Sequence, residues 1–124
     1  MKGTKLMLGI WVAALLLAAA APAGAQSTVD ECKALLGGIQ SDLDAITIGG
    51  NNPDRTRTSL SSKLDGASLK LDQGKYADAV TKLEDFQDAV IAMRDAAKPK
   101  LSAADAGLLL DGAAQAIACI LDLP

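Results

Sequence analysis

Histidine is absent from this 124-residue chain, and aromatic residues make up only 2% of it. Without imidazole, the chain lacks the usual base for activating a serine or cysteine nucleophile and the usual nitrogen ligand for a transition metal. Its net charge of −3 leaves no basic footprint for phosphate, so nucleic acid is a poor partner. A core with so few rings has to be packed from aliphatic side chains, which favours closely spaced helices. These shortages predict a non-enzymatic protein that needs no cofactor.

Residues 1–25 are predicted to be a cleaved signal peptide. Lys2 and Lys5 form its positive start, Leu6–Ala21 is an apolar run, and Ala23–Ala25 is a small-residue cleavage site. The run is shorter than the roughly 20 residues that a membrane-spanning helix needs. We therefore expect a secreted or periplasmic protein that keeps no stable membrane anchor after cleavage.

The cysteine content is low, with Cys32 and Cys119 as the only two in the chain. They are too few for a zinc site by themselves, and they lack the close spacing of a redox-active pair. In an exported chain, two cysteines point to a structural disulfide. On the chain-entropy model, closing so long a loop contributes about 4 to 5 kcal/mol. We expect Cys32 and Cys119 to be bonded, and unpaired thiols remain the alternative.

Residues 26–124 are predicted to form a single all-α domain, a small four-helix up-and-down bundle. In each segment, apolar residues recur at alternating steps of three and four and so line one helical face. Breaks at Gly49–Pro53, at Gly74 and at Lys98–Lys100 separate the segments. The connection at Gly74 is short enough to make the second and third helices an antiparallel hairpin. The expected helices are roughly 28–48, 53–73, 75–97 and 102–122.

Capping residues set the expected start of three of these helices. Thr28 and Glu31 have the spacing of a capping box, and Ser102 with Asp105 resembles one. Asn52 is the expected N-cap of the second helix, because a proline follows it at the first helical position.

Two features interrupt the regular pattern. Gly37 and Gly38 fall inside the first helix, where they are expected either to kink it or to let another helix come close. Leu69, Leu108 and Leu110 lie off the main apolar stripes of their helices. They indicate either a broad buried face, which we favour, or an apolar surface for a partner.

Two polar segments have residues that could hold an ion. Arg55 and Arg57, with the threonines that follow each of them, stand at the start of the second helix, where backbone N–H groups can hold an anion. We favour a solvated first turn there. Aspartates and asparagines between Asp42 and Asp54 supply oxygen ligands for calcium, yet their spacing fits no EF-hand loop. We expect them to cap helices and to solvate the surface.

A framework of mostly aliphatic and small residues runs through the last three expected helices. Its members are Leu60, Lys63, Leu64, Ala67, Leu71, Gly74, Ala79, Leu83, Phe86, Val90, Leu101, Ala106, Leu109, Ala113, Ala114 and Ile117. From about Leu60 to Ile117, and more broadly over about 56–122, the chain resembles the FIMAH domain, a small helical module of secreted bacterial proteins. The resemblance implies an extracellular accessory or interaction module, and it brings no catalytic residues.

Together, the leader, the cysteine pair and this framework predict an exported, non-enzymatic accessory or interaction module. Its expected partner is an unidentified protein or an extracellular polysaccharide. The alternative is a periplasmic carrier whose bundle opens around a small apolar ligand or a lipid. The sequence predicts no catalytic, cofactor or metal site, and its named site residues are the disulfide pair Cys32 and Cys119.

Overall fold

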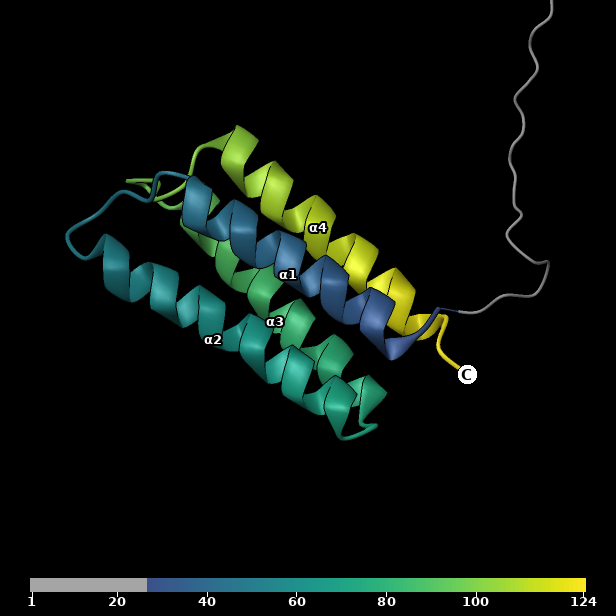
Figure 1. Cartoon of the computed structure of the whole chain (residues 1–124). Helices are drawn as coiled ribbons and strands as arrows, with labels where there is room; N and C mark the ends of the chain where they lie inside the picture. The colour runs from purple at the N-terminus through teal and green to yellow at the C-terminus, as the bar shows by residue number, and fades with distance from the viewer. Residues whose placement is uncertain (1–26) are drawn as a thin grey trace, which may run out of the picture.

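The apolar stripes of the sequence become the buried faces of helices in the computed structural model, which describes residues 27–124 (Figure 1). The predicted signal peptide, residues 1–25, lies outside the described residues. Within the described part, every regular element is an α-helix, as predicted. The helices are α1 (Val29–Ala45), α2 (Pro53–Asp72), α3 (Tyr76–Asp95) and α4 (Ala103–Leu121).

The helices form a closed ring of neighbours. Helix α1 packs against α2 and α4, and α3 packs against the same two helices. Helices that follow each other in sequence therefore lie side by side, and the first and last helices close the ring (Figure 1). This arrangement confirms the predicted up-and-down bundle. The start of α1 and the C terminus lie at the same end of the bundle.

The predicted caps are present, with one difference. The Thr28 N–H donates to Glu31 Oε1 at 2.8 Å, and the Glu31 N–H donates to Thr28 Oγ1 at 3.2 Å, which completes the capping box. Ser102 Oγ accepts from the Asp105 N–H at 3.0 Å. Asn52 is the N-cap residue of α2, but its side chain makes no capping bond, so the following proline starts this helix without that support.

Helix α1 stops at Ala45, before the predicted end at residue 48, because the next residues turn into the core as extended chain. Ile46 has ψ 161°, and both Ile46 and Ile48 are buried. Alternate residues of an extended segment point to the same side, so these two isoleucines close one end of the bundle. The Gly49 N–H then donates to the Lys100 carbonyl at 2.9 Å, which joins the α1–α2 and α3–α4 connections.

The core contains large residues from α3 and small ones from α4. Phe86 is fully buried on α3, whereas Ala106, Ala113 and Ala116 are fully buried on α4. Short side chains on one helix let its neighbours approach closely. The other buried apolar residues are Cys32, Leu36, Ile39, Leu43, Ile46, Ile48, Leu60, Leu64, Ala67, Leu71, Ala79, Leu83, Val90, Leu101, Leu109 and Ile120.

The expected role of Gly37 and Gly38 is wrong. Helix α1 runs through both without a break, both are exposed, and a Cβ added to either would meet nothing within 4 Å. The close approach occurs at Gly112 of α4 instead. A Cβ there would lie 2.9 Å from Ile39 Cγ1, so this glycine is what lets α4 sit against α1.

The preference for burying the off-stripe leucines is wrong for Leu69 and Leu108, whereas Leu110 packs against the core. Leu69 is 54% exposed and Leu108 is 47% exposed, while Leu110 is half-buried. Each helix has two neighbours, so a side chain on its outer surface has nothing to pack against.

Among the described helices, α4 is the one that is long and apolar enough to cross a membrane by length and composition. A core helix of a bundle meets the same criterion, and α4 here packs against α1 and α3.

Candidate functional site: the α1–α4 groove

A disulfide joins the first and last helices at one end of the bundle. Cys32 of α1 and Cys119 of α4 are bonded, as predicted, with their Cα atoms 5.6 Å apart. This separation lies in the usual range for a disulfide. Cys32 is fully buried, and Cys119 is half-buried beside the surface. The bond fixes the spacing of α1 and α4 at the place where the surface between them is hollowed.

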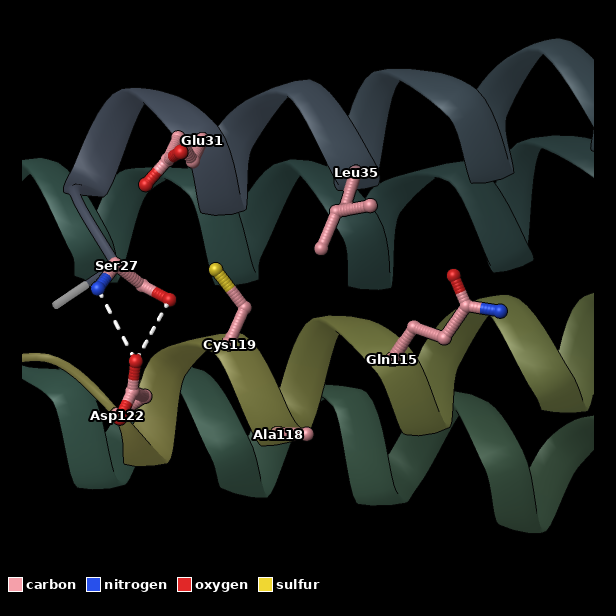
Figure 2. A pocket seen from close by; sticks show the side chains of 7 residues that line it. All are labelled: Ser27, Glu31, Leu35, Gln115, Ala118, Cys119 and Asp122. Carbon is pink, nitrogen blue, oxygen red and sulfur yellow. Dashed lines mark hydrogen bonds between the residues drawn. The ribbon is translucent and has the colours of Figure 1, made fainter. Parts of the chain in front are cut away.

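The hollow next to the disulfide is an open depression of about 570 Å³ (Figure 2). Leu35 from α1 and Gln115 from α4 face it from opposite sides. At its outer end, the N–H and the hydroxyl of Ser27 both donate to Asp122 Oδ2 at 3.1 Å, which ties the start of α1 to the end of α4. The residues that line it are Ser27, Glu31, Leu35, Gln115, Ala118, Cys119 and Asp122.

A second depression, of about 320 Å³, continues the first along the same two helices. The two share Leu35 and Gln115, so together they form one trough, which we call the α1–α4 groove. The second depression is lined by Ala34, Leu35, Gly38, Ile39, Asp42, Leu108, Asp111, Gly112 and Gln115.

The groove exists because its walls carry small side chains. Ala34 and Gly38 on α1 and Gly112 on α4 line the second depression, and Ala118 on α4 lines the first, so no long side chain from these positions covers the trough. Leu108 stands at one end of the trough with nearly half of its surface exposed. The result is an apolar floor that is open to solvent along the outer side of α1 and α4.

Carboxylates flank both ends of this floor. Glu31 and Asp122 line the first depression, and Asp42 and Asp111 line the second, so each end has one acid from each helix. The first pair is held in place by the capping box and by Ser27. Within the described residues, the carboxylates of Asp42 and Asp111 accept no hydrogen bond from the protein, and Asp111 is exposed.

Helices α1 and α4 carry a single basic residue, Lys33, and it points away from the groove. Its Nζ lies 2.9 Å from Asp72 Oδ1 on α2. The hydrogen bond to Asp72 and the charge of that carboxylate raise the pKa of Lys33. The Lys33 ammonium therefore pairs on the α1–α2 side, and the described helices α1 and α4 place no other basic side chain beside the groove.

The segment considered for anion binding has another role. The Arg57 guanidinium donates to the Leu43 carbonyl and, at 3.2 Å, to the Ile46 carbonyl at the end of α1. Thr56 is buried, and its hydroxyl donates to the Asn52 carbonyl at 3.2 Å. Helix α1 has no basic residue in its last turn, so Arg57 supplies the missing donor from α2. The solvated first turn that we favoured therefore holds for Arg55, which is exposed, and not for Thr56 and Arg57, which bond backbone carbonyls.

The aspartates considered for calcium are not gathered into a site. Among the described residues, no group of three or more acidic or cysteine side chains is placed to hold a metal ion. Asp44 accepts a hydrogen bond from Gln40 Nε2 at 3.2 Å on its own helix, and Asp54 lies in the first turn of α2.

Sequence reasoning found the disulfide and missed the groove. The missing signal was the set of small residues that line the trough, Ala34 and Gly38 on α1 and Gly112 and Ala118 on α4. Small residues at these positions, together with an exposed Leu108, indicate a shallow apolar trough once α1 and α4 are known to be neighbours.

Compared with protein-family models, curated proteins and solved structures, the chain matches none of them. The resemblance to the FIMAH domain therefore stays a prediction, and the groove has to be interpreted from its own chemistry.

Proposed function

We propose that this protein is an exported, non-enzymatic interaction module that holds its partner in the α1–α4 groove. The observation that carries the proposal is the groove itself, an open apolar floor on two helices that a disulfide locks together. A concave surface with apolar groups and a few polar ones offers a place for another molecule to bind. The FIMAH-like framework, which implies an accessory module, is consistent with this role.

The disulfide also supports the proposed location. Structural disulfides persist in oxidising compartments outside the cytoplasm, which agrees with a secreted or periplasmic protein. The finer prediction is cleavage of the leader after Ala25. Intact mass measurement of protein from the secreted and periplasmic fractions tests it, because a cleaved chain would begin at Gln26. A chain that kept its first 25 residues would contradict this part of the proposal.

The carrier alternative receives less support from the packing. The floor of the groove is open to solvent, and the space inside the ring of helices is filled by residues such as Phe86, Leu83 and Leu109, each fully buried. A carrier would have to separate these helices, and the disulfide resists that for α1 and α4. Native mass spectrometry of the purified protein distinguishes the two, because a carrier retains its lipid or small apolar ligand.

A matched pair of exposed leucines provides the direct test. A photoreactive amino acid is placed at Leu108, at the edge of the groove, or at Leu69, which is similarly exposed on α2. After irradiation of intact cells, we expect a crosslinked adduct from position 108 and none from position 69. Equal adducts from both positions, or none from either, would contradict an interaction through the α1–α4 groove.

A further inference from the structure

We infer that the α1–α4 groove binds a cationic amphipathic segment, with aliphatic side chains at its centre and lysine or arginine toward its two ends. The inference rests on the proposed function and adds the chemistry of the partner. It follows from the groups along the groove, where two acids line each depression and the shared apolar residue Leu35 lies between the two pairs.

The centre of the groove suits aliphatic side chains. Leu35 forms part of both depressions, and the small residues Gly38 and Ala118 line the trough with it. Leu108 extends the apolar surface and is nearly half exposed. Burying this surface under leucine or alanine side chains removes apolar area from water, which is the main favourable contribution in most associations.

The ends of the groove suit cations. Glu31 and Asp122 stand at one end, and Asp42 and Asp111 stand at the other. Complementary charge selects a partner and speeds its encounter more than it adds raw affinity. A neutral or acidic segment would have to cover these four carboxylates without a compensating charge, which is unfavourable.

The length of the groove matches a short helical segment. Glu31 and Asp42 are about three turns apart on α1, which corresponds to about 16 Å along the axis. A bound helix with cationic side chains about three turns apart would reach both ends at once. Its apolar residues between them would then lie over Leu35.

A second copy of this chain is a poor occupant. Pairing the same face of two molecules would bring carboxylates against carboxylates, because Lys33 is held by Asp72 on α2. An anionic surface, whether a lipid or a nucleic acid, is repelled for the same reason.

The test uses the purified, disulfide-bonded protein and synthetic amphipathic peptides that are labelled for fluorescence anisotropy. One peptide has leucine and alanine on one face and lysines about three turns apart. A second replaces the lysines with glutamates, and a third has the lysine peptide's composition in scrambled order. We expect saturable binding of the first peptide alone, and weaker binding as the salt concentration rises.

Paired variants locate the binding surface. Asp42→Asn with Asp111→Asn removes two groove charges, whereas Asp85→Asn with Asp88→Asn removes two exposed charges from α3. We expect the double variant in the groove to bind the lysine peptide about tenfold more weakly than the native protein. The double variant on α3 should bind it with nearly unchanged affinity. Circular dichroism checks that both variants keep their helix content.

Three outcomes would overturn the inference. The glutamate or the scrambled peptide would bind as well as the lysine peptide, the α3 pair would weaken binding as much as the groove pair, or the protein would self-associate through the groove in sedimentation equilibrium. In these cases, an adduct from Leu108 in cells would still support the interaction module and contradict only its cationic partner. Absence of that adduct would contradict the proposed function itself.

Discussion

The two halves of the bundle are held together in different ways. Helices α2 and α3 are joined by a tight turn in which Gly74 adopts φ 73°, so they meet soon after leaving the turn. Helices α1 and α4 are joined by a disulfide between residues 87 positions apart. Closing a short loop costs little conformational entropy, and closing a long one costs more. The disulfide therefore joins the two helices that chain connectivity alone does least to hold together.

The two halves also differ in their surface charge. Helices α2 and α3 mix both signs, whereas α1 and α4 carry acids and a single base that faces α2. Mixed charge suits a surface that stays in water. A hollow apolar floor with acids of one sign around it suits a partner of opposite charge. The basic residues of α2 and α3 are Arg55, Arg57, Lys63, Lys70, Lys82 and Arg94.

The largest expected loss of stability comes from removing the disulfide that joins α1 to α4. Replacing Cys32 and Cys119 by alanine should lower the free energy of unfolding by about 4 to 5 kcal/mol on the chain-entropy model, because the unfolded chain regains its freedom. Urea denaturation followed by circular dichroism measures the loss. Adding reductant should lower the stability of the native protein and leave the double variant unchanged. A loss below about 1 kcal/mol would mean that native contacts alone hold α1 to α4.

The stability of the α2–α3 half should depend on the packing of buried side chains, because no disulfide joins these two helices. Phe86→Ala should cost about 3 to 5 kcal/mol, because Phe86 is fully buried and its removal leaves a cavity. Leu108→Ala is the control, and it should change stability by less than about 0.5 kcal/mol because the surface around it is open. Equal losses from the two variants in denaturant titrations would contradict the core described above.

Two glycines of the α1–α4 half should respond in opposite directions. Gly112→Ala should destabilise by about 1 to 3 kcal/mol, since its Cβ would press on the buried Ile39 side chain. Gly38→Ala should stabilise by up to about 1 kcal/mol, because it adds helix propensity in open space. Thermal unfolding followed by circular dichroism compares them. A stabilising Gly112→Ala would show that α4 does not depend on this close approach.

The smallest effect concerns the ion pair that links the two halves. Hydrogen bonding to Asp72 raises the pKa of Lys33 above its ordinary value of 10.5, so the folded state holds this proton more tightly. The contribution is fully present below the unfolded pKa and disappears as pH rises through the folded pKa. Melting temperatures across the alkaline range should therefore fall more for the native protein than for Lys33→Met. Parallel curves for the two proteins would show that the pair adds nothing measurable.

Much of the fold could be predicted because it depends on neighbours within one helix. Capping residues such as Thr28 and the repeat of apolar residues located the helices within a few positions. The cysteine pairing was simple to predict, because the chain has two cysteines and they allow one intramolecular disulfide, between Cys32 and Cys119.

Other features depended on contacts between segments, and the sequence pattern does not contain those. Helix α1 ends early because Ile46 and Ile48 fill the end of the bundle. The Arg57 guanidinium on α2 also donates hydrogen bonds to carbonyl groups at the end of α1. The groove required knowing that Gly38 and Gly112 lie on neighbouring helices. A pattern shows which residues share a face, and it does not show which face meets another helix or remains open.

The position of the disulfide has a mechanical consequence. Cys32 and Cys119 lie within a few residues of the two ends of the described chain, and both ends are at one side of the bundle. A pull applied across the two flanking segments would pass through the sulfur–sulfur bond, so the polypeptide between the cysteines would stay slack under tension. Oxidised protein held between two tethers should extend only by the segments outside the two cysteines, and reduction should release the full contour length of the helices between them.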